Sequence, residues 1–266
     1  MNRPLVTFTS DFGQDDWFVG VVRGVIHERC PEARVVDLTH RIPPGDIERA
    51  AFVVEAATPD FAEGTVHLVV VDPGVGSGRR ALAARARGHL FVGPDNGVLE
   101  WALASPDAEV RELADAKLFR HPVSRTFHGR DVFAPVAARL AGGLRLDAVG
   151  PRVSDPVRLA AQAPAERSGE LCGRVMFVDR FGNVLTNLTE HDLAARFPGV
   201  PPERLEVEAV GHVMQGLARA YADAPVGSIV AILDSSGRLE IAQVRGDASR
   251  RLGLAVRDDV RVRLRR

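Results

Sequence analysis

The segment Leu5-Val6-Thr7-Phe8-Thr9-Ser10-Asp11-Phe12-Gly13 opens with a β-branched and aromatic run and ends in turn-forming residues, which predicts a strand leading into a loop. Apolar residues at near-helical spacing over 17–26 predict a helix after that loop. A strand at 34–38, a helix at 46–57 and an almost fully apolar strand at 66–71 continue the alternation. This order predicts parallel strands with right-handed crossovers in a layered α/β domain.

Polar loops follow several of these strands, and ligands in such sheets bind outside the carboxyl ends of the strands. Asp11 and Asp16 follow the first strand, 72–80 follows the third, and 93–97 follows a short strand at 90–92. A further polar loop, 126–131, precedes an apolar helix expected at 132–140. The sequence therefore predicts a ligand site at this edge of the sheet.

The composition changes over 143–168, where prolines interrupt any regular element. We expect an α/β domain at 1–150, a proline-containing linker at 151–168 and a second domain at 169–266. Short alternating segments in the second domain predict a small antiparallel sheet or barrel with little helix. The expected strands are 172–178, 184–188, 205–210, 228–233, 238–243 and 260–264.

Composition excludes several protein classes. The 266 residues carry a formal charge of -1, so no excess positive field favours a nucleic acid partner. Cys30 and Cys172 form no C-x-x-C pair, which argues against a zinc cage or disulfide framework and favours a reducing cytoplasm. No secretion signal is visible, and the apolar runs are too short for a membrane span. Trp17 and Trp101 lie on helical patterns and are expected to pack internally.

The loop Asp72-Pro73-Gly74-Val75-Gly76-Ser77-Gly78-Arg79 combines three glycines with an acid and a base. It matches neither the Walker loop nor G-x-G-x-x-G. The glycines would allow a ligand to approach the backbone, but a tight strand connection with Arg79 in solvent fits equally well.

His128 lies between Phe127 and Gly129, where the aromatic ring would wall a pocket and the glycine would leave room for substrate. A structural histidine remains the alternative. Asp11 suits either a turn or the vicinal hydroxyls of a ribose, because each carboxylate oxygen accepts hydrogen bonds. Asp11, Asp16, Asp72 and His128 show no H-x-x-x-H or H-x-H spacing, so no metal site is expected.

In the second domain, an aromatic, a glycine and two asparagines interrupt the β pattern over 179–187. Asparagine offers a donor and an acceptor together, which suits the edge of a purine, whereas an Asn-capped hairpin turn is the structural alternative. The arginine-rich run 245–266 is interleaved with aspartates and is expected to be a solvated face.

Six segments stand out together and span almost the whole chain: 9–13, 71–76, 94–97, 126–131, 179–187 and 235–242. In this order they resemble the S-adenosyl-L-methionine (SAM) hydroxide adenosyltransferase family, which is related to the SAM-dependent fluorinase and chlorinase. The resemblance implies an N-terminal α/β/α domain and a C-terminal β-barrel in a homotrimer, with SAM bound between neighbouring subunits. It also implies that SAM and water give adenosine and L-methionine, without a metal or redox cofactor.

The resemblance assigns a role to each matching position. Asp72, Arg79 and His128 match the set that positions and activates water. The substrate site would comprise Asp11 at the ribose hydroxyls, Phe181 and Asn183 around adenine and the methionine end, Asp179 near the methionine amino group, Ser235 at its carboxylate, and Asp16, Phe127 and Gly129.

The related halogenases differ at these positions. They have a tyrosine in the place of Asp72, and the fluorinase has a tyrosine and a serine in the places of His128 and Gly129. The fluorinase also has an arginine at Ser236, so another group would hold the methionine carboxylate here. The resemblance thus favours the hydrolytic branch and leaves the proton acceptor open. The alternatives are a halide-using SAM enzyme, a non-catalytic SAM or adenosine sensor, and a metal-dependent nucleoside hydrolase.

Overall fold

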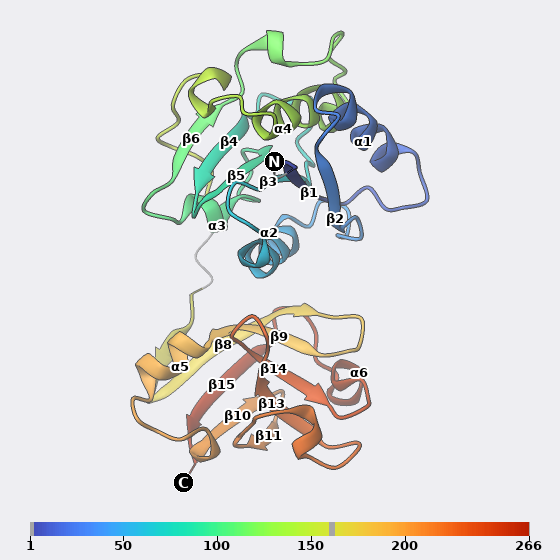
Figure 1. Ribbon diagram of the computed structural model, residues 1–266. Coiled ribbons are helices and arrows are strands. Elements are labelled where there is room, and N and C mark those ends of the chain that lie inside the picture. Colours follow the sequence, from blue (N-terminus) through green and yellow to red (C-terminus); the bar gives the residue numbers. More distant parts are fainter. Residues whose placement is uncertain (1–2, 160–162, 266) are drawn as a thin grey trace. The chain divides into compact units, whose positions relative to one another are not determined.

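The computed structural model describes residues 3–159 and 163–265. The chain forms two compact units, Met1–Ala160 and Ala161–Arg266, which Figure 1 draws in blue to green and in yellow to red. Within the described residues, no helix has the length and apolar character needed to cross a bilayer.

The first unit is built on one mixed, mostly parallel sheet. Its strands are β1 (Leu5–Ser10), β2 (Arg34–Thr39), β3 (Val66–Val70), β4 (Ala81–Ala86), β5 (His89–Pro94) and β6 (Glu109–Glu112), in the order β2-β1-β3-β5-β4-β6. The pairs β1–β2, β1–β3 and β3–β5 are parallel, and β4 is antiparallel to both of its neighbours. The carboxyl ends of β1, β3 and β5 therefore meet at one edge.

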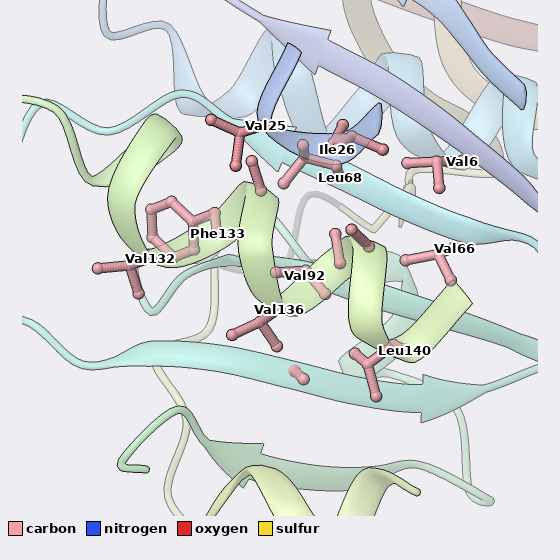
Figure 2. Packing of buried hydrophobic residues seen from close by; sticks show 14 of the residues in the cluster. Val6, Val25, Ile26, Val66, Leu68, Val92, Val132, Phe133, Val136 and Leu140 are labelled. Carbon is pink, nitrogen blue, oxygen red and sulfur yellow. The ribbon is translucent and has the colours of Figure 1, made fainter. Parts of the chain in front are cut away.

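Helices cover both faces of this sheet, which makes three layers. Helices α1 (Phe18–Arg29) and α4 (Ala134–Ala141) share a core with Leu68 of β3, as Figure 2 shows. Helices α2 (Ile47–Ala57) and α3 (Glu100–Leu103) pack with Val69, the next residue along the same strand. Alternate side chains of β3 thus enter opposite cores, which explains its almost fully apolar sequence.

The predicted α/β domain is confirmed, with local differences, among them the strand β6, which was not expected. Strand β4 had no strong signal because its sequence, Ala-Leu-Ala-Ala-Arg-Ala, is rich in alanine, a poor strand former. The helix expected at 132–140 begins instead with a π-helical turn, η3 (Gly129–Phe133), which runs into α4.

The second unit is a nearly closed, mainly antiparallel β-barrel, as predicted. Its strands are β7 (Ala165–Arg167), β8 (Glu170–Val178), β9 (Val184–Thr189), β10 (Leu205–Ala209), β11 (His212–Gln215), β12 (Leu217–Ala218), β13 (Ile229–Leu233), β14 (Arg238–Gln243) and β15 (Asp259–Leu264). The order is β11-β10-β15-β8-β9-β14-β13-β12, with β7 beside β8. Among the described strand pairs of this second unit, only β12 and β13 are parallel. Leu188, Leu239 and Val262 are fully buried in its core.

Short helices complete the two units. They are α5 (Glu190–Arg196), α6 (Ala248–Leu252) and the 3-10 turns η1 (Thr58–Asp60), η2 (Ala116–Leu118), η4 (Leu146–Val149), η5 (Pro202–Arg204) and η6 (Tyr221–Asp223). Helix α5 begins with a capping box in which Thr189 and Asp192 each accept a backbone N–H of the other.

Candidate active site

Three side chains of the first unit form a continuous polar chain beyond the end of β3. The Arg79 guanidinium donates from Nε to Asp72 Oδ1 at 2.8 Å and from Nη2 to Asp72 Oδ2, so the pair is bidentate. Arg79 Nη2 also lies 2.8 Å from Nδ1 of His128. The Asp72 and Arg79 side chains are 5% and 11% exposed, so this pairing is shielded from water. The structure brings together the three residues that the sequence singled out.

The contact with Arg79 fixes the protonation of His128. Arginine has only donors, so Nδ1 of His128 accepts the hydrogen bond and the ring proton of the neutral imidazole lies on Nε2. Burial and the Arg79 guanidinium lower the pKa of His128, against opposing contributions from Asp72 and Asp131. His128 is therefore neutral at pH 7 and offers an N–H donor from Nε2.

The glycine-rich loop is held against the loop that carries His128. Gly76 has φ +77°, and a Cβ atom at this position would lie 2.2 Å from the carbonyl oxygen of Arg125. Only glycine permits both this backbone conformation and this approach. The contact lies three residues before Arg79 on one loop and three residues before His128 on the other, so it sets their separation.

A buried carboxylate, Asp131, holds the second loop in place. Its side chain is fully buried in the π-helical turn and accepts from Arg130 Nε at 2.7 Å and from the backbone N–H of Ser124 at 2.9 Å. Burial by itself raises the pKa of Asp131, but these hydrogen bonds outweigh it and hold the pKa below its usual value. Asp131 thus stays charged and fixes the turn that begins next to His128.

Asp11 links the first loop to the segment before α2. Its Oδ2 accepts the backbone N–H of Gly45 at 2.8 Å. Behind it, Ser10 Oγ lies 2.7 Å from His40 Nδ1, and His40 Nε2 lies 3.2 Å from Asp37 Oδ1. Burial lowers the pKa of His40 to about 4, so its ring is neutral at pH 7. These buried contacts fix the backbone that carries Asp11.

Aromatic rings line the same edge of the unit. The Phe127 ring meets Phe12 and Phe18 edge to face, with centroids 5.9 and 5.3 Å apart. A Cβ atom at Gly129 would lie 3.2 Å from the Phe12 ring, so the glycine lets this ring pack closely. Trp17 is not a packing residue as expected, because it lies just before α1 and is 69% exposed.

Two other acids of this edge lie apart from the polar chain. Asp16 is exposed in the bend before α1 and, among the described residues, forms no hydrogen bond or ion pair with Asp72, Arg79 or His128. Asp95 accepts hydrogen bonds from Arg80 Nε at 2.7 Å and from the backbone N–H of Val157 at 2.7 Å. Across residues 3–159 and 163–265, no three His, Cys, Asp or Glu side chains are grouped as metal ligands.

The other predicted residues lie in the second unit, around a pocket of about 880 Å³. It is lined by Asp179, Phe181, Asn183, Leu185, Tyr221, Ile232, Leu233, Asp234, Ser235, Glu240, Gln243, Val244, Arg245 and Gly246. All four residues predicted here, at positions 179, 181, 183 and 235, therefore share one pocket.

The loop between β8 and β9 presents an aromatic ring at this pocket. Asp179 Oδ1 accepts the backbone N–H groups of Phe181 and Asn183 at 2.8 and 2.9 Å, which closes the turn. Gly182 has φ +84°, and a Cβ there would lie 2.2 Å from Asp247. The turn leaves Phe181 75% exposed, so its face is free to stack on a planar group.

Sequence reasoning assigned no role to five polar residues of this pocket: Tyr221, Asp234, Glu240, Gln243 and Arg245. Glu240 lies in the segment 235–242 that carries part of the family resemblance and in the middle of the apolar strand at 238–243, but neither signal gave it a role. Tyr221 lies in the short 3-10 turn η6 and Asp234 directly follows β13, and no sequence pattern marks either residue.

The structure thus defines a two-domain protein, an α/β/α unit with a charged site at its strand ends and a β-barrel unit with a ligand-sized pocket. Residues 6–150 match the SAM hydroxide adenosyltransferase N-terminal domain, and residues 173–261 match the C-terminal domain of the same name. The chain belongs to the SAM hydroxide adenosyltransferase family.

Individual relatives agree with this assignment. A protein named (R)-S-adenosyl-L-methionine hydrolase from Thermus thermophilus is 44% identical, covering 95% of this chain and 96% of its own. A fluorinase from Nocardia brasiliensis is 30% identical, covering 91% and 90% of the two chains. The crystal structure of an uncharacterized conserved protein from Thermotoga maritima superposes with a TM-score of 0.91 at 37% identity, covering 97% and 99%.

Proposed function

We propose that this protein hydrolyses SAM to adenosine and L-methionine by attack of water on the ribose 5′-carbon. The observation that carries the proposal is the hydrogen-bonded chain from Asp72 through Arg79 to His128. A tyrosine in the place of Asp72, as the halogenases have, would remove the carboxylate that binds Arg79.

The reaction needs an oriented nucleophile more than it needs a strong acid. The new bond forms between the water oxygen and C5′, while the C5′–sulfur bond breaks and its electron pair stays on sulfur. Methionine leaves as a neutral thioether, and one proton is released from the attacking water. Holding the water opposite sulfur, away from bulk solvent, supplies much of the reduction in the barrier.

We assign a different role to each of the three residues from the hydrogen bonds that it makes. Arg79 has no lone pair to accept a proton, and the one free lone pair of neutral His128 is occupied by Arg79. Asp72 is a carboxylate with acceptor capacity beyond its two bonds to Arg79, so we assign it the role of proton acceptor. His128 Nε2–H then donates a hydrogen bond that orients the water.

The remaining predicted residues bind substrate. Asp11 accepts hydrogen bonds from the ribose hydroxyls. Phe127 and Gly129 shape the side of the site where the nucleophile binds, and Asp16 lies at the margin of the substrate site. In the second unit, Phe181 and Asn183 lie around adenine and the methionine end, Asp179 binds near the methionine amino group, and Ser235 contacts the methionine carboxylate. By resemblance to the family, the protein is a homotrimer in which neighbouring subunits share each SAM. Its two cysteines, which form no C-x-x-C pair, favour a reducing cytoplasm.

The decisive experiment is incubation of the purified protein with SAM in oxygen-18 water, followed by mass analysis of the nucleoside. The name of the Thermus relative specifies the (R) epimer at sulfur, so (R)- and (S)-SAM are assayed separately. We expect adenosine labelled at the 5′-oxygen and one methionine per adenosine. Heat-inactivated protein is the control.

Other outcomes would replace this proposal. A 5′-halo-adenosine formed only when fluoride or chloride is added would make the protein a halogenase. SAM that stays bound and unchanged for hours would make it a sensor. Activity that chelation abolishes and a divalent metal restores would point to metal-dependent hydrolysis.

A further inference from the structure

The segment 94–97 is the one part of the family resemblance that the proposed function leaves without a role. It begins at the last residue of β5 and leads towards α3. Gly97 has φ +93°, and Asn96 Oδ1 accepts the backbone N–H of Val98 at 3.1 Å, which closes a turn. Closing this turn needs only an acceptor, so it does not account for the amide donor of Asn96 or for the carboxylate of Asp95.

The amide donor of Asn96 holds the start of the loop 72–80. Asn96 Nδ2 donates to the backbone carbonyl of Val71 at 2.9 Å. That carbonyl belongs to the same peptide plane as the N–H of Asp72, so fixing the one orients the other. The hydrogen bond therefore fixes the direction in which the chain leaves β3 and enters Asp72.

Asp95 holds the end of the same loop. Its backbone N–H donates to the carbonyl oxygen of Arg80 at 3.0 Å, and this oxygen also accepts from Arg79 Nη1 at 3.4 Å. Its carboxylate oxygens accept one donor each, Arg80 Nε and the backbone N–H of Val157, both at 2.7 Å. The side chain is 2% exposed, so its charge-assisted bond to Arg80 is shielded from water. Asp95 is thus one carbonyl group away from the guanidinium that binds Asp72.

We infer that Asp95 and Asn96 are positioning residues, which set the geometry of Asp72 and Arg79 by holding both ends of their loop. The inference rests on the proposed function, because it takes that pair as part of the reacting site. The two positioning residues are adjacent on one turn, so the two ends of the loop are held to a common support. A misplacement of about 1 Å can lower a rate by about 100-fold, so the loss of this support should affect turnover more than SAM binding.

Two substitutions test the two contacts separately. Asn96→Asp keeps the size of the side chain and the oxygen that closes the turn, but loses the donor to Val71. Asp95→Asn keeps the shape but loses the charge that holds Arg80. Arg80→Lys keeps one charged donor, so it should retain part of the effect of the arginine.

Two matched controls separate positioning from other effects. Asp155→Asn removes the other carboxylate that binds Arg80, which is 80% exposed and does not contact residues 95 or 96 within the described chain. Val54→Ala removes buried apolar volume near the end of α2, so it lowers the melting temperature without touching the loop 72–80.

Steady-state assays should show a fall in kcat and little change in KM. We expect Asn96→Asp and Asp95→Asn to lower kcat by roughly 10- to 100-fold and to change KM by less than about threefold. Arg80→Lys should show a smaller fall of the same kind, and it carries the test if either of the first two variants does not fold. Both controls should keep the kcat of the unsubstituted protein.

A second measurement follows the geometry without substrate. In protein labelled with nitrogen-15 at histidine, the NMR shifts of His128 report which ring nitrogen carries the proton. Arg79 now holds that proton on Nε2 by donating to Nδ1. If the support from Asp95 or Asn96 is lost, the shifts should move towards a mixture of the two tautomers, whereas Val54→Ala should leave them in place.

Three results would overturn the inference. An unchanged kcat in folded variants would remove both residues from positioning, and a raised KM with unchanged kcat would move them to substrate binding. A fall in kcat that Val54→Ala reproduces, with unchanged His128 shifts, would leave them a structural role only. Failure of the proposed function is separate, since it appears as absence of labelled adenosine from unsubstituted protein, while the NMR comparison still decides whether the two residues hold the loop.

Discussion

The polar clusters of the two units differ in how their charges are balanced. In the first unit, Asp72, Arg79 and His128 satisfy one another without any ligand. In the second unit, Glu240 lies buried beside two further carboxylates with a tyrosine as its only hydrogen-bond partner in the described chain. The first cluster is thus preorganised for a small neutral molecule such as water, whereas the second keeps a buried carboxylate whose only hydrogen bond within the described chain is from a neutral hydroxyl.

The largest expected effect comes from breaking the balance in the first unit. Asp72→Asn removes the proton acceptor and the charge that holds Arg79, so kcat should fall by about 10²- to 10⁴-fold. Affinity for SAM should change little, because Asp72 faces the nucleophile in our proposal. Steady-state and single-turnover assays separate the two quantities.

Asp155→Asn is the matched control for that substitution. Asp155 also pairs with an arginine, Arg80, but its side chain is 80% exposed, so the exchange should leave kcat unchanged. A collapse of SAM affinity in Asp72→Asn with an unaltered rate at saturation would show that Asp72 binds substrate instead.

The contact between the two loops of the first unit offers an intermediate effect. Gly76→Ala forces a side chain into a backbone with φ +77° and against the Arg125 carbonyl, at a cost of roughly 1–3 kcal/mol. The melting temperature should fall by several degrees, and kcat should fall with it because His128 moves relative to Arg79. Gly78→Ala in the same loop has open space and no positive φ, so melting and turnover should stay near their original values. Equal behaviour of the two variants would contradict the role given to Gly76.

The smallest expected effect is on stability at acid pH, which should decline more in the first unit than in the second. Burial lowers the pKa of His67 to about 3 and of His40 to about 4, and both lie in the first unit. The unfolded state binds these protons more readily, so stability is unaffected above pH 6.5 and declines as the pH falls towards 3 to 4. The two histidines of the second unit, His191 and His212, are exposed.

Denaturant titrations at pH 7.5, 6.0 and 5.0 would measure this decline through tryptophan fluorescence. Trp17 and Trp101 are the only tryptophans in the sequence, and both belong to the first unit. His67→Gln removes one of the buried titrating groups and should flatten the dependence on pH, whatever it does to absolute stability. An unchanged slope would show that His67 does not contribute.

The sequence predicted the parts of the site that depend on topology. Parallel strands place their carboxyl ends at one edge, which is why Asp11 and Asp72 could be expected near each other. The contact of Arg79 with His128, 49 residues away, required the family resemblance, because no local pattern encodes a meeting of two loops. The barrel was likewise predicted from short alternating segments, and its strands lie close to the expected positions.

Features that depend on partners remote in sequence escaped prediction. Glu240 is buried and accepts a hydrogen bond from Tyr221, 19 residues earlier, whereas a single charged residue in a strand usually indicates a solvent-facing position. The π-helical turn depends on Asp131, whose burial and bonds to Arg130 and Ser124 arise only in the folded loop. Trp17 follows a helical spacing but precedes the helix, so its periodicity was misleading.

The π-helical turn also has a consequence for how the gene can change. A π turn holds one residue more than the α-helical turn it replaces, and each residue of an α-helix rotates the chain by about 100°. Loss of a single codon between Gly129 and Phe133 would leave a regular helix behind but swing His128 away from Arg79. This loop is therefore expected to tolerate insertions and deletions less well than substitutions.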